Sequence, residues 1–176
     1  MWLVLLFRVC LLSGFLLSAW KWGDWKNWQK YYSTILFVMV ANLSAGYISY
    51  HHPLWIYNDD AIFTTEASIE YLNTYLALPA VTLIYLSNFP VAGTAHKCAY
   101  VLMWVVVFST IEYIDTQIAG LSYSNGWALK YSIVFDYFMF LIIRTHYVRP
   151  LSGWLLAVMM AVFILATFNY FSAEMK

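Results

Sequence analysis

Six apolar segments divide the chain, and each is long enough to cross a lipid bilayer as a helix. A spanning helix needs about 20 mostly apolar residues. The segments are residues 2–20, 33–50, 68–86, 99–118, 127–143 and 151–171. Because the connections are short, we predict an all-α fold, a compact bundle of about six transmembrane helices that forms a single domain over residues 1–176. The alternative is five spans, with residues 2–20 apart from the bundle or residues 68–86 re-entrant.

The composition excludes other broad classes of protein. Hydrophobic residues make up 63% of the chain and charged residues 10%, whereas soluble domains are roughly 45–50% apolar and about 25% charged. The 9 Lys and Arg residues balance the 9 Asp and Glu residues, so the basic surplus of a nucleic-acid-binding protein is missing. Cys10 and Cys98 form no C-x-x-C pair and no two histidines face each other within the spans, so we expect no metal, haem or other cofactor.

Basic residues in the short loops predict the orientation of the helices. Most loop lysines and arginines fall on one side, and only Lys130 and Lys176 fall on the other. The residues of the first side are Lys21, Lys26, Lys30, Lys97, Arg144 and Arg149. We place this side in the cytoplasm, which puts both chain termini outside. His146 belongs to the same basic loop and is expected beside lipid headgroups, while clustered tryptophans anchor the bundle in membrane lipids.

Charged and amide side chains inside the predicted spans are the best indicators of function, because each is costly to bury in lipid. Glu112 and Asp115 lie one turn apart on one helix face, and Asp136 lies near the middle of its span. The predicted ligand-binding residues are Arg8, Asn42, Glu70, Asn73, Glu112, Asp115 and Asp136. Arg8 is the only basic residue of this set, and the acidic residues outnumber it. A carboxylate without a basic partner holds a proton or binds a cation.

These residues predict a protein that binds a small ligand or cation in an acidic, outward-facing cavity, as a transporter subunit or a sensor. Two other functions stay open. Glu112 and Asp136 would be the catalytic acid and counter-charge of an intramembrane enzyme acting on a lipid or isoprenoid, as in small terpene cyclases. Alternatively, Arg8 pairs with Glu112 and the polar residues only hold helices together, in a structural or partner-binding subunit. Pro79 should disturb the third span by freeing the carbonyl of Tyr75.

A series of short motifs in a fixed order resembles a known family. The motifs are Trp25-Lys26, Tyr31–Phe37, Pro53-Leu54-Trp55, Leu78–Thr82, Ile111–Ile114, Asn125-Gly126-Trp127 and Arg144–Tyr147 before Pro150-Leu151. They resemble the family of small uncharacterised multi-pass membrane proteins of endospore-forming Bacillota, over nearly the whole chain. The resemblance implies a bacterial inner (cell) membrane, gives no catalytic residues, and places Glu112 and Asn125-Gly126-Trp127 in the family signature. It leaves open the ligand, the oligomeric state and whether the chain is an enzyme.

Overall fold

The computed structural model describes residues 1–170; residues 171–176, with Lys176 and the end of the last predicted span, lie outside this part. Most of each of the six apolar segments lies in one helix or in one continuous helical run, and residues 168–170 of the last segment form a turn after α7. The helices are α1 (Trp2–Trp22), α2 (Gln29–Ser49), the run of α3 (Glu66–Leu72), η2 (Asn73–Ala77) and α4 (Leu78–Ser87), α5 (Thr94–Gln117), α6 (Leu129–Val148) and α7 (Pro150–Thr167). A short 3-10 turn, η1 (Trp25–Asn27), joins α1 to α2.

Five of these helices are long and apolar enough to span a membrane: α1, α2, the α3–α4 run, α5 and α7. Helix α6 is 20 residues long, but Asp136, Arg144 and His146 interrupt its apolar sequence. The fold is therefore that of a helical protein suited to a membrane, and a sixth crossing by α6 remains a prediction.

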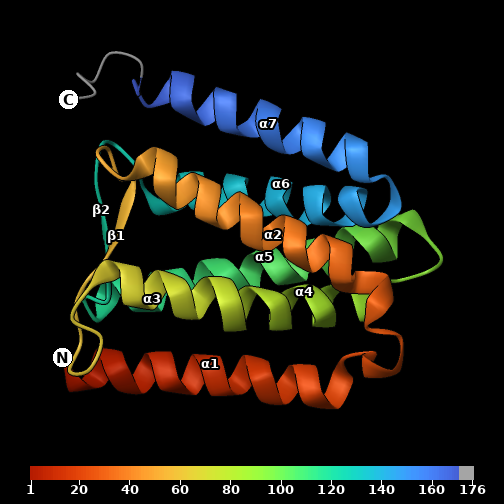
Figure 1. Cartoon of the computed structure of the whole chain (residues 1–176), viewed down its shortest axis with the longest axis horizontal. Coiled ribbons are helices and arrows are strands. Elements are labelled where there is room, and N and C mark those ends of the chain that lie inside the picture. The colour runs from red at the N-terminus through yellow and green to blue at the C-terminus, as the bar shows by residue number, and fades with distance from the viewer. Residues whose placement is uncertain (171–176) are drawn as a thin grey trace.

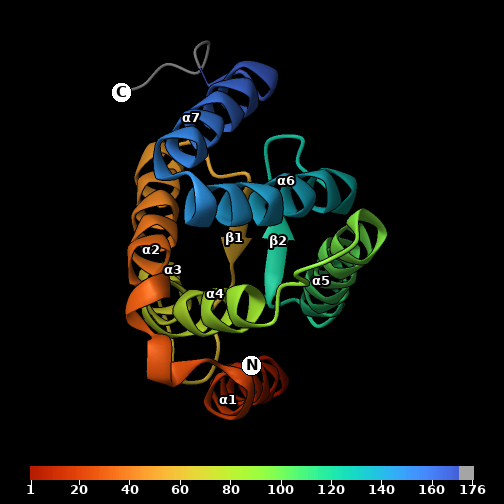
Figure 2. The same cartoon turned by 90° about the vertical axis from the view of Figure 1, so that its right-hand side faces the viewer.

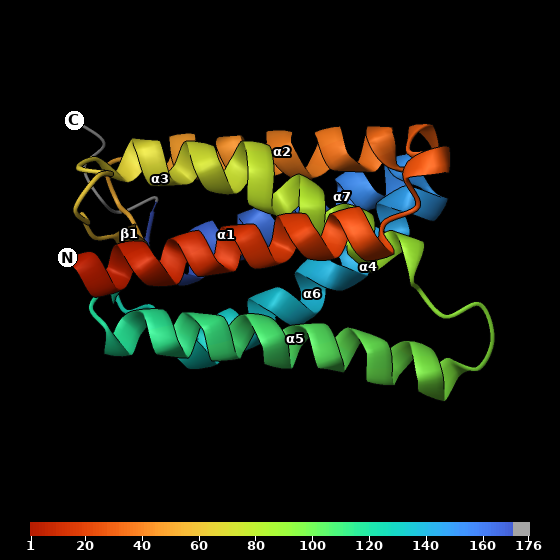
Figure 3. The same cartoon turned by 90° about the horizontal axis from the view of Figure 1, so that it is seen from below.

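The helices run back and forth along one long axis, so that successive connections alternate between two ends (Figure 1). Helix α4 packs against α1 and α2, and α6 packs against α5 and α7. The beginning of α1 and the end of α7 lie at the same end, which we call the sheet end (Figure 1). We call the opposite end, with the α1–α2, α4–α5 and α6–α7 connections, the basic end. Seen from below, α1 runs beside both α4 and α5 (Figure 3).

A two-stranded antiparallel sheet closes the sheet end, a feature that the sequence did not predict. Strand β1 (Trp55–Tyr57) pairs with β2 (Leu121–Tyr123), and Trp55 lies opposite Tyr123. Ser124-Asn125-Gly126 forms a tight turn, as Asn-Gly sequences often do: Asn125 and Gly126 have φ of 50° and 83°, and the Trp127 N–H donates to the Ser124 carbonyl at 2.9 Å. This turn leads from β2 into α6.

The disturbance predicted at Pro79 takes the form of a π-helical segment, η2. The Leu78 N–H donates to the Asn73 carbonyl, five residues earlier, instead of the usual four. Pro79 then lies in the first turn of α4, directly after this segment.

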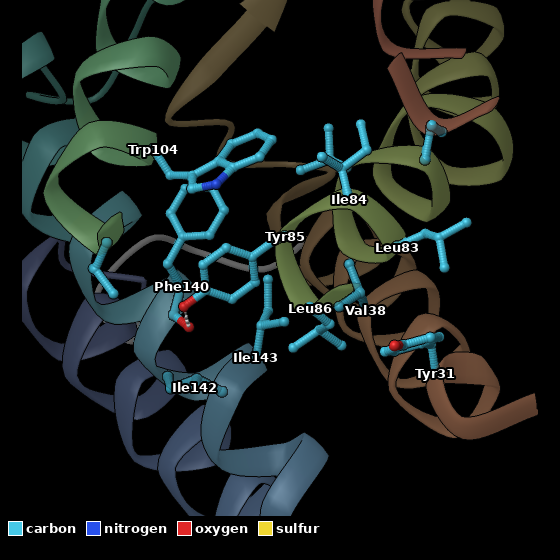
Figure 4. Packing of buried hydrophobic residues seen from close by; sticks show 14 of the residues in the cluster. Tyr31, Val38, Leu83, Ile84, Tyr85, Leu86, Trp104, Phe140, Ile142 and Ile143 are labelled. Atoms are coloured by element: carbon cyan, nitrogen blue, oxygen red, sulfur yellow. Dashed lines mark hydrogen bonds between the residues drawn. The ribbon is translucent and has the colours of Figure 1, made fainter. Parts of the chain in front are cut away.

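Aromatic side chains fill the bundle between its middle and the basic end (Figure 4). Tyr85 and Phe140 are completely buried, and their ring centroids are 5.0 Å apart. The Tyr85 hydroxyl donates to the Phe140 carbonyl at 3.0 Å, which ties α4 to α6. Trp104 of α5 packs on both rings, with centroids 6.1 Å from Tyr85 and 5.6 Å from Phe140.

The structure corrects the position predicted for His146. It lies inside α6, only 3% exposed, rather than in a basic loop. Its Nδ1 atom is 3.0 Å from the Thr34 hydroxyl of α2, and its ring stacks on Phe37 with centroids 4.0 Å apart. Gly153 of α7 lies so close that a Cβ there would be 2.4 Å from the His146 Cβ. His146 is therefore a packing residue at the junction of three helices.

Candidate functional site

Arg8 bonds to the loops of the sheet end, not to Glu112 as the structural alternative predicted. Its Nη1 atom lies 2.7 Å from Oδ2 of Asp60. Its Nη2 atom donates to the carbonyls of Asn58 at 2.8 Å and Gly120 at 2.9 Å. One guanidinium therefore connects α1 with the segments that follow β1 and precede β2.

Asp60, which the sequence analysis did not select, is fully buried. Its Oδ1 atom accepts hydrogen bonds from the backbone N–H groups of Ile62 and Phe63, at 2.9 and 2.8 Å. Burial alone would raise the pKa of Asp60, but these two donors and the Arg8 guanidinium outweigh it and hold the pKa below its usual value. Asp60 is thus a charged structural partner of Arg8, and Arg8 leaves the list of ligand-binding residues.

Two other predicted residues join α2 to the α3–α4 run. The Asn42 side-chain amide donates to the Thr74 hydroxyl at 2.8 Å. The Glu70 carboxylate lies over Gly46, where a Cβ would approach it to 3.2 Å. Asn73 contributes the backbone carbonyl that closes the π-helical turn. Asn42 and Asn73 therefore act in helix packing.

Glu112 is held by neutral donors. The Tyr123 hydroxyl of β2 donates to Glu112 Oε1 at 2.7 Å, and the Ser132 hydroxyl of α6 donates to the same oxygen. The Trp127 indole N–H in turn donates to Ser132 at 2.8 Å. The three donors come from β2, the following turn and α6, so the end of α5, the sheet and α6 meet at this carboxylate.

Asp136 lies one helical turn beyond Ser132 on the same face of α6. It is only 5% exposed, and within residues 1–170 its Oδ2 atom has no hydrogen-bond partner. Asp115, at the end of α5, is 8% exposed, and its Oδ1 atom has no partner in the same range. A buried polar atom without a partner is rare in native proteins and calls for a ligand, a water molecule or a chemical role.

The sheet covers these carboxylates. Trp55, Tyr57, Leu121 and Tyr123 lie on one face of the sheet, because opposed residues of two strands point to the same side. The Tyr123 bond to Glu112 shows that this face looks into the bundle, and Figure 2 shows both strands across the end of the space between α4, α5 and α6. The pKa of the Tyr57 phenol is raised, first by burial and then by the nearby carboxylates, with Asp115 foremost.

The predicted site residues therefore divide into two groups. Asp115, Glu112 and Asp136 gather beneath the sheet, with Glu70 also close enough to act on Tyr57. Arg8, Asn42 and Asn73 serve packing. In the described part of the chain Arg8–Asp60 is the only ion pair, so none of these four carboxylates forms an ion pair there, although the Arg8 charge is close enough to act on Asp115. Over the same residues, no group of three or more His, Cys, Asp or Glu side chains is placed to hold a metal ion.

The site is covered rather than open. Two grooves on the described surface lie elsewhere, one beside Gly93 and His96 at the basic end and one along Gly14 between α1 and α5. Sequence reasoning missed Tyr57, Tyr123 and Asp60 as parts of this region. The segments Trp55-Ile56-Tyr57 and Leu121-Ser122-Tyr123 are rich in strand-forming residues, but each is too short to be told from the apolar background.

Comparison of the chain with protein-family models, with curated proteins and with solved structures gives no match. The arrangement of its own residues therefore carries the functional argument.

Proposed function

We propose that the protein is a multi-pass protein of a bacterial cell membrane that binds a small ligand or cation at the carboxylates of α5 and α6, as a transporter subunit or a sensor. The supporting observation is Asp136, a buried carboxylate with an unpartnered oxygen as far as residue 170, next to a second carboxylate, Glu112. A structural network would satisfy each of its buried polar atoms, and this one leaves both Asp136 and Asp115 incompletely bonded.

The charge of the site favours a positively charged ligand. The buried carboxylate of Asp136 and the half-buried carboxylate of Glu112 repel each other unless one is protonated or a cation lies between them. The three groups that donate to Glu112 and Ser132 are all neutral, so they orient the acceptors without cancelling their charge. A cation or a proton is the partner that this arrangement lacks.

The sheet end is proposed to face outward. The basic end carries Lys21, Lys26, Lys97 and Arg149 at or near its connections, and such residues favour the cytoplasmic side. The site then lies behind the sheet at the outer side of the membrane, and both chain termini lie outside. The resemblance to membrane proteins of endospore-forming Bacillota points to the same membrane.

Thermal unfolding of the purified protein in detergent tests the proposal. The midpoint is measured over a pH series and in sodium, potassium and choline chloride. We expect at least one of these variables to shift the midpoint in the wild type and in Asp59→Asn, a control in an exposed loop residue. Asp136→Asn should remove that shift. Equal responses of all three proteins would refute a ligand at Asp136.

An acid-catalysed reaction on a lipid or isoprenoid is the second candidate, favoured by the aromatic rings beside the carboxylates. Trp127 packs on Trp55 at 5.4 Å and on Phe135 at 6.4 Å, which walls the α6 side with rings that stabilise cationic species. Lipid extracts of cells that express the wild type or Glu112→Gln decide this point. A product that depends on Glu112 would establish the enzyme, and identical extracts would exclude it.

A further inference from the structure

A row of buried polar atoms without partners runs through the bundle below the sheet. Among the described residues these atoms are Asp115 Oδ1, Ser109 Oγ, Asp136 Oδ2, Trp104 Nε1 and Thr82 Oγ1. Three of them lie on α5 in the order 115, 109 and 104, which spans about 16 Å along a helix at 1.5 Å per residue. The row thus extends from the sheet end deep into the bundle.

The remaining two atoms face the same interior from neighbouring helices. Asp136 shares a face of α6 with Phe140, four residues on, and Thr82 shares a face of α4 with Tyr85, three residues on. Phe140 and Tyr85 pack on each other and on Trp104, so the three helices turn these faces toward one another (Figure 4). The aromatic rings close the row on the side of the basic end.

The row is suited to single water molecules rather than to a coordinated metal. Buried waters typically bond to polar atoms that have no other partner. A metal ion needs several ligands converging on one point, and the described chain places no three acidic, histidine or cysteine side chains in that way. At its outer end the row meets Glu112, Ser132 and Tyr123. The hydroxyl groups of Ser132 and Tyr123 can each donate and accept a hydrogen bond.

Resting on the proposed function, we infer that the ligand of this site is a proton, which Asp136 exchanges with the sheet end through Ser132, Glu112 and Tyr123. A hydronium ion at the sheet end gives up a proton and becomes water, while the Asp136 carboxylate becomes a carboxylic acid. Release reverses the same transfer. A proton needs no coordination shell, and a carboxylic acid beside Glu112 removes the repulsion between the two charges.

Few titratable groups face Asp136. Glu112 approaches from α5 and Tyr123 from β2. On α4, the hydroxyl of Tyr85 bonds to the Phe140 carbonyl, one turn beyond Asp136. Helix α7 has no ionisable residue between Pro150 and Thr167. Helix α2 presents Tyr31 to α6 only at the basic end, stacked on Tyr147. A pH-dependent signal lost in Asp136→Asn can therefore be assigned to the pair of Asp136 and Glu112.

Infrared difference spectroscopy of the protein in lipid films tests this inference through the carbonyl band of a protonated carboxylic acid. We expect a band that titrates with pH, is unchanged by sodium, potassium or choline at fixed pH, and disappears in Asp136→Asn but not in Asp59→Asn. Asp136→Glu retains a carboxylic acid and should keep the band at a shifted position. If Asp136→Asn does not fold, this shift still tests whether the band belongs to residue 136.

Two results would overturn the inference, and they differ in what they leave standing. Loss of the band on adding one of the cations at constant pH would identify that cation as the ligand and leave the proposed function intact. The absence of any Asp136-dependent band, together with no response to cations, would overturn both.

Discussion

Arg8 of α1 and Asp60 of the loop after β1 form an ion pair whose nitrogen and oxygen lie 2.7 Å apart, with the Arg8 side chain 12% exposed and the Asp60 side chain fully buried. Arg8 also bonds to the backbone carbonyls of Asn58, after β1, and Gly120, before β2, which are neighbours at one end of the sheet. The pair therefore holds the first helix against the sheet that covers the carboxylates of α5 and α6.

Arg8→Met should destabilise the protein by about 3–5 kcal/mol, because it leaves the Asp60 charge buried without its partner. Asp60→Asn keeps the acceptor for the Ile62 and Phe63 N–H groups and removes the charge. The double variant should therefore be less destabilised than the sum of the two single variants. Thermal or denaturant unfolding in detergent measures all three, and additive effects would contradict a direct pair.

The same pair predicts a pH dependence. Because the folded-state pKa of Asp60 lies below its usual value of 3.8, its contribution is complete above that value. It is lost as the pH falls through the lower, folded-state pKa. The unfolding midpoint of the wild type should therefore fall more steeply below about pH 4 than that of Asp60→Asn. Asp59→Asn, in the exposed neighbouring residue, should follow the wild type; parallel curves for all three would rule the contribution out.

The helices could be predicted from sequence because their signal is local. An apolar stretch of about 20 residues is sufficient to indicate a membrane helix, and most of each predicted segment lies in a helix. Local turn chemistry was equally informative at Asn125 and Gly126, where both residues adopt positive φ. Depth counted along a helix also placed Glu112 and Asp136 in one region.

The partners of the polar residues could not be predicted, because they depend on how the loops fold back. The structural alternative pairs Arg8 with Glu112, but Asp60 reaches Arg8 from a loop 52 positions away. His146 was assigned to a loop from its basic neighbours, although the helix continues to Val148 and turns the imidazole inward. The three-residue strands are too short for their alternation to stand out from the apolar background.

Gly153→Ala should destabilise the protein by about 1–3 kcal/mol, the cost of overpacking a close helix contact. The added Cβ would lie 2.4 Å from the Cβ and 2.5 Å from the Cα of His146, and a backbone atom cannot rotate away. Gly14→Ala is the matched control: it is also helical, and its Cβ would have no neighbour within 4 Å. The control should be neutral or slightly stabilising. Equal unfolding midpoints for the two variants would refute the contact between α6 and α7.

Ser132→Ala should cost about 1–3 kcal/mol, because it leaves the buried Trp127 indole N–H without its acceptor and removes one donor to Glu112. Tyr123→Phe removes only the other donor to Glu112 and leaves the indole bonded. It should therefore be the milder change. Chemical unfolding followed by tryptophan fluorescence compares the stabilities of the two variants. A larger loss of stability for Tyr123→Phe would contradict the hydrogen bonds described for Ser132.

Thr34→Val should destabilise the contact between α2 and α6 by about 1–3 kcal/mol, because it replaces the only hydroxyl bonded to the buried His146 ring within residues 1–170. Thr34→Ser is the matched control, since it keeps the hydroxyl and removes only a methyl group. Nitrogen NMR of labelled histidine should show a changed Nδ1 environment in Thr34→Val and a nearly unchanged one in Thr34→Ser. If both variants left the His146 signal and the unfolding midpoint unchanged, the hydrogen bond would make no contribution to the helix junction.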